Sequence, residues 1–304
     1  MMGILGAGGA IGGELAKLYG ARRERVRLVG RNPKPAGAHT ETVAADLANP
    51  EDATRAVEGT EIAFLLAGLK YDVAAWRELW PRIMRNTIDA CKRAGARLVF
   101  FDNVYMYGRV DGPMTEEAPF RPCSAKGEIR ARIASTLLEE MAAGRITATI
   151  ARAADFYGPG VRTGVPNLLV FDKLKAGAKP MCLANDAVPH SYTYTPDAAR
   201  ALLLLAESDV AWGQTWHLPT ASDPPTGKEF IELAAKEFAR PAKYRVLSRG
   251  MMRIGGWFNS EIRELVEMLY QNEFPYVFDS GKFERAFALS PTPYAEGIRA
   301  CVKA

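Results

Sequence analysis

A glycine-rich segment near the N-terminus constrains the fold of this chain more than any other feature. The apolar residues Met1–Leu5 predict a short β-strand, and the segment Gly6–Gly13 follows at once, ahead of a helical pattern. In a strand–turn–helix unit of this kind, Gly6 permits a tight turn, Gly9 lets the backbone approach a pyrophosphate, and Gly12 allows the helix to pack closely on the strand. The unpaired N–H groups at the start of the helix would face the phosphates. The segment therefore predicts nucleotide binding, with a plain tight turn as the alternative.

Short apolar strands alternate with helical patterns through the first half of the chain. Strands are expected at Val26–Val29, Thr42–Ala44, Ile62–Leu66, Leu98–Phe101 and Ile146–Ile150, and the clearest helical patterns cover Ala74–Ala94 and Glu128–Met141. Nearly all-apolar strands that alternate with helices are typical of a parallel sheet covered on both faces. Because such crossovers are right-handed, we predict an α/β fold with a doubly wound, Rossmann-type parallel sheet.

The pattern changes after about Gly158, where glycine and proline become frequent. Helices are expected at Leu168–Lys175, Ala198–Glu207 and Lys228–Phe238, with a strand at Thr215–Leu218 and an irregular segment from Pro180 to Pro189. We interpret residues 1–158 as a dinucleotide-binding domain to which residues 190–218 return. Residues 159–189 and 219–304 are interpreted as a smaller, C-terminal substrate-binding cap.

Composition limits the kinds of protein to consider. The 304 residues carry 39 Lys and Arg against 35 Asp and Glu, and this dispersed excess of +4 does not favour a nucleic-acid partner. The dense apolar run Ala201–Ala206 is six residues long, too short to cross a membrane, and the N-terminus does not read as a signal peptide. Four scattered cysteines without metal-type spacing suit a reducing compartment. We therefore expect a cytoplasmic protein without a membrane partner or a metal site.

The end of the second expected strand bears on the choice of cofactor. An acidic residue there would bind the ribose 2′-hydroxyl of NAD, whereas an arginine can bind the 2′-phosphate of NADP. No Asp or Glu occurs between Val26 and Ala38, and Arg31 stands where that phosphate would lie. Because a guanidinium complements a phosphate, we favour NADP and keep NAD as possible. A solvated loop arginine is the alternative interpretation.

Several segments together resemble the extended short-chain dehydrogenase/reductase family, which includes nucleotide-sugar epimerases and dehydratases. The resemblance covers about residues 3–220 and is carried by Gly6-x-x-Gly9-x-x-Gly12, Asp46-Leu47, Leu66-Ala67-Gly68, Leu98–Gly108, Arg152–Gly160, His190–Tyr194 and Asp197–Ala201. It implies an enzyme that binds a nicotinamide dinucleotide and a small-molecule substrate. The cofactor-binding residues that it implies are Gly6, Gly9, Ala10, Ile11, Gly12, Arg31, Asp46, Leu47, Leu66, Ala67, Gly68 and Ala154.

The catalytic pattern of that family is incomplete in this chain. The family uses a Ser or Thr five residues before the glycine of its Tyr-Gly pair, and Asn103 has that position here. It also uses Tyr-x-x-x-Lys at the start of the next long helix, where this chain aligns Cys123 and Gly127. Taking Lys126 as the lysine instead puts Pro122 at the tyrosine, so neither register restores the motif. We therefore do not expect proton transfer by the usual tyrosine.

Replacement groups lie nearby in the sequence. The candidate catalytic residues are Asn103, Tyr105, Cys123 and Lys126, and the candidate substrate-binding residues are Asn167, His190 and Tyr192. The amide of Asn103 can donate a hydrogen bond to a carbonyl oxygen but cannot titrate, whereas a histidine can transfer protons near neutral pH. Structural alternatives stay open: Tyr105 packing in its loop, His190 positioning a neighbour, and Asn167 capping a helix.

Three functions follow from an intact cofactor segment without the usual catalytic pair. The first is an NADP-dependent oxidoreductase of the epimerase/dehydratase type that acts on a small carbonyl or hydroxylated, sugar-like substrate with a nonstandard proton donor. The second is an inactive NADP-sensing protein, and the third is a redox-neutral isomerase or lyase. The resemblance also implies a homodimer, and the apolar stripe of Ile129, Ile133, Leu137 and Met141 is consistent with one. Packing within one chain explains the same stripe.

Overall fold

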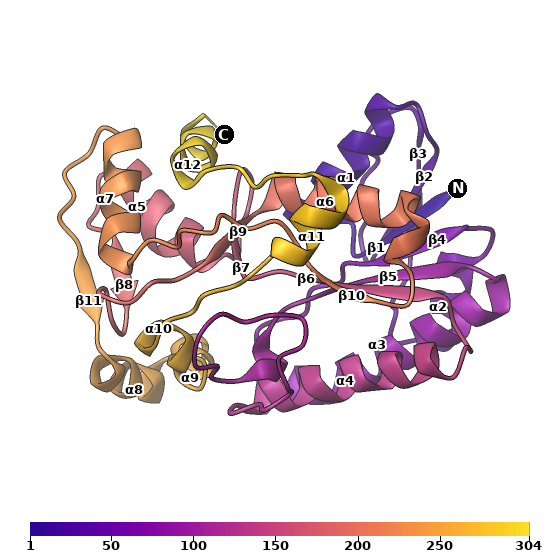
Figure 1. Ribbon diagram of the computed structural model, residues 1–304, viewed down its shortest axis with the longest axis horizontal. Coiled ribbons are helices and arrows are strands. Elements are labelled where there is room, and N and C mark those ends of the chain that lie inside the picture. Colours follow the sequence, from indigo (N-terminus) through magenta and orange to yellow (C-terminus); the bar gives the residue numbers. More distant parts are fainter. Residues whose placement is uncertain (304) are drawn as a thin grey trace.

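A seven-stranded parallel sheet forms the centre of the molecule (Figure 1). The computed structural model of this chain describes residues 1–303. The strands are β1 (Met2–Leu5), β2 (Val26–Gly30), β3 (Thr40–Ala44), β4 (Ile62–Leu65), β5 (Arg97–Asp102), β6 (Ala148–Arg152) and β10 (Thr215–His217). They lie in the order β10-β6-β5-β4-β1-β2-β3, and every neighbouring pair is parallel. The predicted doubly wound, Rossmann-type α/β fold is confirmed.

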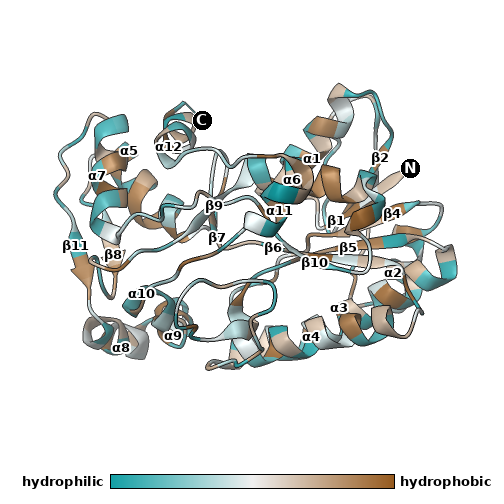
Figure 2. Ribbon diagram, viewed as in Figure 1, coloured by the Kyte–Doolittle hydropathy of each residue, from teal (hydrophilic) through white to brown (hydrophobic). Residues whose placement is uncertain are grey.

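Helices cover both faces of the sheet, as Figure 1 shows. One face packs against α2 (Pro50–Val57), α3 (Val73–Ala94) and α4 (Ala125–Ala142), and the other against α1 (Ala10–Ala21) and α6 (Thr195–Glu207). Figure 2 shows apolar residues concentrated along the strands and on the helix sides that face them. The stripe of Ile129, Ile133 and Leu137 is buried in this core within the single chain. Core packing therefore accounts for the stripe.

Most of the C-terminal part lies beyond the carboxyl ends of the sheet strands (Figure 1). It contains α5 (Asp172–Lys175), α7 (Gly227–Glu237), α8 (Arg249–Phe258), α9 (Ser260–Val266), α10 (Tyr270–Glu273), α11 (Gly281–Phe287) and α12 (Tyr294–Val302). Two small parallel sheets pair β7 (Asp155–Tyr157) with β9 (Tyr192–Tyr194), and β8 (Met181–Leu183) with β11 (Arg245–Leu247). The segment Pro180–Pro189, expected to be irregular, thus contains a strand. That prediction was wrong because three residues carry little pattern and the partner strand lies far along the chain.

Side chains fix where several helices begin. Asn49 accepts hydrogen bonds from the first amides of α2, Asp72 does so at α3, and Ser124 does so at α4. Such caps satisfy N–H groups that have no partner within the helix. Helix α1 begins at Gly9 without a side-chain cap, so its first turn leaves backbone donors open to a ligand.

The strand order defines where a ligand can bind. The crossovers reverse direction between β1 and β4, and in such sheets ligands bind outside the carboxyl ends of the strands at this point. Gly6 follows β1, Leu66 follows β4, and Asn103 follows β5. Three of the segments singled out in the sequence therefore leave the sheet at the same edge. Among the described residues, no helix is both long and apolar enough to cross a membrane.

Candidate active site

The glycine-rich turn is shaped by close contacts with the neighbouring strand ends. Gly6 has φ +98°, and a Cβ atom there would lie 2.5 Å from the backbone of Ala67. A Cβ atom at Gly12 would lie 3.1 Å from Cα of Ala7, whereas Gly9 has only one atom within 4 Å, the Gly6 carbonyl oxygen at 4.0 Å. Gly6 and Gly12 are therefore needed for packing, and Gly9 leaves its backbone open. This is the arrangement that a pyrophosphate requires.

The first turn of α1 offers backbone donors to an anion. Gly9 has an extended conformation at the N-cap, and no acidic side chain lies in the first turn. The first helical hydrogen bond within this turn runs from Gly13 N to Gly9 O at 3.0 Å. The amides of Ala10, Ile11 and Gly12 precede it and point out of the helix end. With the positive end of the helix dipole, they fit a phosphate group.

The segments after β2 and β3 lie further along the same edge. Arg31 directly follows β2 and is exposed, and within residues 1–303 its guanidinium forms no ion pair. Asp46 follows β3 and is exposed too, with its carboxylate accepting a hydrogen bond from Ala48 N at 3.0 Å. Leu47 is buried. Arg31 is thus available to bind a ligand group. The carboxylate of Asp46 is exposed to solvent and can accept a further hydrogen bond.

The ends of β4 and β6 complete the expected cofactor surface. Leu66 and Ala67 are half-buried beside the glycine turn, and Leu66 N donates to Leu5 O at 2.8 Å. Gly68 is exposed. Ala154 is buried after β6, where its amide donates to the hydroxyl of Thr193 at 3.0 Å. The structure thus places these segments along the carboxyl edge of the sheet.

Asn103 begins the loop that follows β5. Its side-chain oxygen accepts a hydrogen bond from Tyr105 N at 3.1 Å. Its backbone N–H donates a hydrogen bond to the carboxylate of Asp102 at 2.9 Å. These bonds form a local turn that leads into the short 3₁₀ helix Tyr105–Tyr107. The side-chain NH₂ of Asn103 keeps its donors for another group.

A buried network of charged and polar side chains supports this loop from behind. Asp102 accepts a hydrogen bond from Arg130 Nε at 2.9 Å, and Arg152 Nε lies 3.5 Å from its second oxygen. Arg152 donates to the hydroxyl of Tyr107 at 2.6 Å, and that hydroxyl lies 2.9 Å from Nε2 of His217. Burial lowers the pKa of His217 to about 3, so its ring is neutral. The network fixes the ends of β5 and β6 and therefore the position of Asn103.

Tyr105 lies in the candidate site with a second tyrosine as its partner. Its ring stacks on Trp76, with centroids 6.2 Å apart and planes 11° apart. The hydroxyl of Tyr71 contacts the hydroxyl of Tyr105, and burial raises the pKa of both phenols above the ordinary value. Both hydroxyls are therefore protonated at neutral pH and act as hydrogen-bond donors.

Lys126 and Cys123, at the start of α4, have different surroundings. Lys126 is fully buried, and its Nζ lies 2.5 Å from Glu264 Oε2 and 2.8 Å from Glu267 Oε1. Cys123 is an exposed free thiol. A Cβ atom at Gly127 would lie 2.7 Å from Tyr105 O. Lys126 thus binds two acids of the C-terminal part. Gly127 packs against the backbone of Tyr105, so this position has no room for a side chain.

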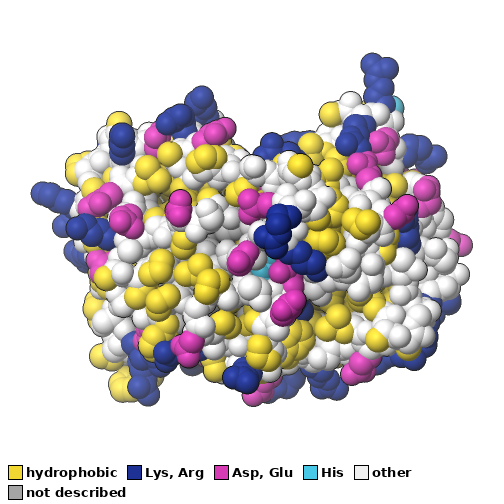
Figure 3. Space-filling model, viewed as in Figure 1, with side chains coloured by type: hydrophobic (Ala, Val, Ile, Leu, Met, Phe, Trp, Pro, Cys, Tyr) yellow, Lys and Arg dark blue, Asp and Glu magenta, His cyan; other side chains and the backbone are white. Residues whose placement is uncertain are grey.

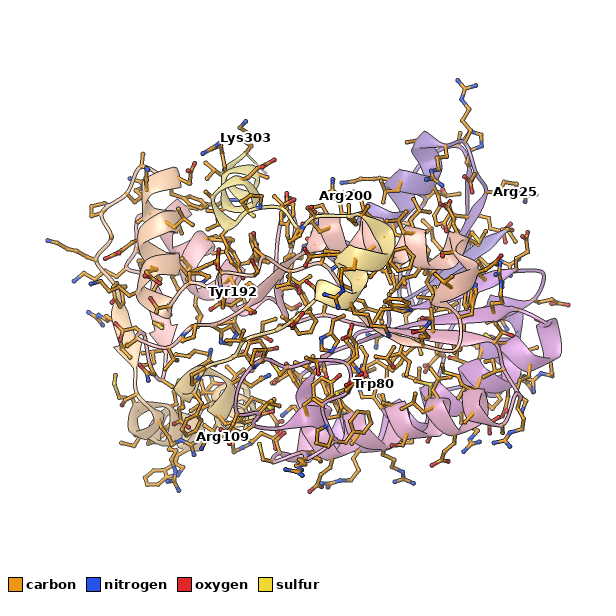
Figure 4. All side chains as sticks on the ribbon, in the orientation of Figure 1. Arg25, Trp80, Arg109, Tyr192, Arg200 and Lys303 are labelled. Carbon is orange, nitrogen blue, oxygen red and sulfur yellow. The ribbon has the colours of Figure 1, made fainter. Side chains whose placement is uncertain are left out.

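His190 and Asp155 bring a second polar pair to the site. His190 Nε2 lies 3.1 Å from Asp155 Oδ2, and the histidine ring stacks on Tyr276 and lies against Tyr192. Tyr192, labelled in Figure 4, is buried at the start of β9. Asn167 is buried in the C-terminal part, where its side chain accepts a hydrogen bond from the N–H of Gly158 and donates one to its C=O. In this structure Asn167 holds a loop.

Sequence reasoning missed four residues of this site. Asp155 lies within the segment Arg152–Gly160, where its position just after β6 was a usable signal. Tyr71, Tyr270 and Tyr276 carried no such signal, because nothing in the sequence shows which distant segments pack together. Within residues 1–303, no cluster of His, Cys, Asp and Glu suited to a metal is present. On the face shown in Figure 3, basic and acidic side chains are interspersed.

Comparisons with known proteins agree with this architecture. The model of the NAD dependent epimerase/dehydratase family matches residues 2–217. A search of curated proteins found no match. Similar solved structures include MoeE5 in complex with UDP-glucuronic acid and NAD, with a TM-score of 0.81 and 20% identity over 99% of this chain and 97% of that chain.

Two further structures have the same fold. The UDP-glucose 4-epimerase of Thermus thermophilus in complex with NAD has a TM-score of 0.81 and 19% identity, over 100% of this chain and 98% of that chain. A double mutant of DesIV, a dTDP-glucose 4,6-dehydratase from Streptomyces venezuelae with NAD and DAU bound, has a TM-score of 0.80 and 18% identity, over 100% and 96%. Together with the strand order and the glycine turn, the match over residues 2–217 shows that this chain belongs to the NAD dependent epimerase/dehydratase family.

Proposed function

We propose that this protein is a nicotinamide dinucleotide-dependent oxidoreductase of the epimerase/dehydratase type. Its substrate is a small carbonyl or hydroxylated, sugar-like compound, and its proton donor is not the usual tyrosine. The observation that carries the proposal is the placement of polar, proton-bearing side chains beside Ala154, at the same sheet edge as the open first turn of α1. Structures with similar folds contain UDP-glucuronic acid or UDP-glucose, which supports a sugar-like substrate.

The chain's own residues suit the cofactor. Gly6 and Gly12 lie in a turn that leaves little room for a Cβ atom at either position. The amides that follow Gly9 would bind the pyrophosphate. Asp46 and Leu47 would flank the adenine, while Leu66 to Gly68 and Ala154 would line the path toward the nicotinamide. When bound, the nicotinamide supplies or accepts a hydride. The cap, residues 159–189 and 219–304, would cover the substrate.

The polar residues of the site have distinct roles in this proposal. Asn103 has amide donors for a substrate oxygen, and the protonated hydroxyl of Tyr105 donates to the same region. His190 and Tyr192 would form the substrate-binding wall, and Asn167 would act by holding Gly158 in place. Lys126 and Cys123 lie at the edge of the site, where Lys126 would hold α9 against α4.

We propose NADP as the preferred cofactor because Arg31 is exposed beside the expected 2′-position. Fluorescence titration with NADPH and NADH should show tighter binding of NADPH in the wild-type protein. The change Arg31→Ala should weaken NADPH at least about tenfold relative to NADH, because one charge-assisted contact to phosphate is lost. The control is Arg23→Ala, an exposed residue away from this edge. Equal losses for both nucleotides would remove Arg31 from the phosphate site.

The enzymatic proposal is tested by turnover. Purified protein is incubated with NADPH or NADP and a panel of aldehydes, ketones, keto-sugars and nucleotide sugars, and the absorbance of the reduced nicotinamide is followed. Oxidation or reduction of the nicotinamide supports the oxidoreductase. Tight NADPH binding without any turnover supports the sensing protein instead, which the missing Tyr-x-x-x-Lys pattern favours as the second candidate. A product formed while no hydride moves to or from the nicotinamide at any stage supports the isomerase or lyase.

The location and the assembly of the protein are proposals as well. Cys91, Cys123, Cys182 and Cys301 are all free thiols, which is consistent with a cytoplasmic enzyme. A homodimer would use outward-facing residues of α3 and α4, since the apolar stripe of α4 is already buried. Sedimentation equilibrium at micromolar concentration should give twice the mass of the chain, and a monomer would contradict the dimer.

A further inference from the structure

Asp155 and His190 form a hydrogen-bonded pair of which only one member meets solvent. Asp155 Oδ2 lies 3.1 Å from His190 Nε2. The histidine side chain is 3% exposed, whereas the aspartate side chain is 23% exposed. Asp155 lies on β7 and His190 just before β9, so the pairing of these two strands brings them together. The carboxyl group is therefore the accessible end of a pair whose other end is buried.

The far side of the histidine ring determines where its proton lies. His190 Nδ1 is 3.1 Å from the carbonyl oxygen of Gln271, and the amide of Asn272 is more distant, at 3.4 Å. Because a carbonyl oxygen only accepts hydrogen bonds and lies closer than the Asn272 amide, these contacts favour a proton on Nδ1. In a neutral ring with that proton on Nδ1, Nε2 has a lone pair facing Asp155. With the proton on Nδ1, the 3.1 Å contact between Nε2 and the carboxyl group is a hydrogen bond only when a further proton lies between these two atoms.

The second buried histidine, His217, has a different partner at Nε2. His217 also directs Nδ1 to a carbonyl oxygen, that of Asp279, at 2.9 Å. Its Nε2 faces the hydroxyl of Tyr107, which brings its own proton. His217 therefore stays neutral without an added proton. The partner of His190 is an acid, which donates only if it has first been protonated.

Several phenol groups lie around the pair. Those that interact electrostatically with Asp155 are Tyr71, Tyr105, Tyr192, Tyr270 and Tyr276, and the charged groups next to them are Lys126, Arg130 and Glu267. Burial raises the pKa of every one of these phenols, so they remain protonated donors at neutral pH. Among these groups, Asp155 is the one whose carboxyl group faces a histidine ring nitrogen.

We propose that Asp155 and His190 are the proton-transfer pair of this enzyme, with Asp155 as the catalytic residue and His190 as the positioning residue behind it. The inference rests on the proposed function. Asp155 follows Ala154 at the carboxyl edge of the sheet, where the reacting end of the cofactor would lie. The pair thus takes the place of the tyrosine and lysine that this chain lacks.

The step is balanced for a carbonyl substrate. As the carbonyl carbon receives a hydride, its oxygen forms an O–H bond with the proton shared by Asp155 and His190. The bond between that proton and the pair breaks, and its electrons stay on the pair as carboxylate and neutral imidazole. In the oxidation direction, Asp155 takes the hydroxyl proton as the hydride leaves the carbon. The phenol of Tyr105 donates a hydrogen bond to the substrate oxygen in both directions.

A first experiment measures the proton without any substrate. The chain has three histidines, so ¹⁵N-histidine NMR of the full-length protein resolves each ring. At pH 7 we expect Nδ1 of His190 to carry a proton, and we expect Nε2 to change to a bare acceptor in Asp155→Asn, whose amide can donate. His217 should be the same in both proteins. A wild-type His190 ring with its proton on Nε2 alone would overturn the proposal.

A second experiment measures catalysis with a substrate found in the panel. Asp155→Asn and His190→Gln should lower kcat about 100-fold or more, with the Kd of NADPH changed less than about threefold, and should remove one limb of the pH profile of kcat/KM. Asp186→Asn, which removes the charge from a carboxylate that accepts a hydrogen bond from Tyr244, is the control for general damage to this part. Activity and a pH profile like those of the wild type in Asp155→Asn would overturn the proposal.

The two experiments separate this inference from the function on which it rests. If the wild-type protein does not bind NADPH, the proposed function fails, while the NMR measurement still reports on the pair. If the wild type turns over and both variants keep its rate, the pair is excluded and the oxidoreductase stands. Near-ultraviolet circular dichroism that matches the wild type shows that each variant is folded.

Discussion

Replacing Lys126 tests whether burial gives its ion pairs their strength. Lys126 is fully buried and binds Glu264 and Glu267, whose side chains are 15% and 27% exposed. The two acids also accept hydrogen bonds from Val73 N and Ala125 N, at the starts of α3 and α4. One ammonium group therefore holds α9 against two helices of the nucleotide-binding part.

Lys126→Met keeps most of the side-chain volume and removes the charge. Breaking a buried ion pair costs roughly 3–5 kcal/mol, because the remaining charge has no partner. Here the two carboxylates keep backbone donors and some water, so we expect a loss of about 3 kcal/mol in the free energy of unfolding. The control is Lys17→Met. Lys17 is 71% exposed and lies 2.7 Å from Glu14, so the same change should cost less than about 1 kcal/mol.

Urea unfolding followed by tryptophan fluorescence measures both variants. A double-mutant cycle with Glu264→Gln should give a coupling energy of at least about 1 kcal/mol with Lys126→Met. The test and control pairs have nearly equal N–O distances, so burial is the variable that differs. If Lys126→Met and Lys17→Met lowered stability by the same amount, the reasoning from burial would be refuted.

Two further predictions concern the glycine turn and His217. Gly6→Ala puts a Cβ atom into the backbone of Ala67 at a positive φ, so it should cost about 3 kcal/mol or more and abolish NADPH binding. Gly13→Ala has open space in α1 and should stabilise the protein by about 0.5–1 kcal/mol; urea unfolding compares the two, and equal effects would contradict the packing argument. The pKa of His217 falls from 6.5 to about 3 on folding, so the unfolded chain binds its proton first as the pH drops. Stability from this group should therefore be complete above pH 6.5 and decline below it, by at most about 1.4 kcal/mol per pH unit. His217→Gln should flatten that decline in urea midpoints measured between about pH 7 and 4, and an unchanged slope would contradict it.

Local patterns were sufficient to predict the nucleotide-binding half. The strands β1, β2, β4 and β5 fall within about two residues of the expected ranges, because nearly all-apolar runs have few structures open to them. Gly6 was predicted to permit a tight turn and Gly12 to allow close packing; Gly6 has φ +98°, and a Cβ atom at Gly12 would lie 3.1 Å from Cα of Ala7. The cap was less predictable, since β8 and β11 have three residues each and pair across the chain.

The sequence alone predicted a parallel sheet whose first strand leads into an open glycine turn. The spacing of the glycines between one strand and one helix is enough to specify that unit. The sequence also predicted that the usual catalytic tyrosine and lysine are missing. Only the tertiary structure shows which groups lie near the positions expected for that tyrosine and lysine. Lys126 forms ion pairs with Glu264 and Glu267, and His190 lies within hydrogen-bond distance of Asp155. Those partners lie far apart in the chain, and their distances depend on how the cap packs, which no local pattern specifies.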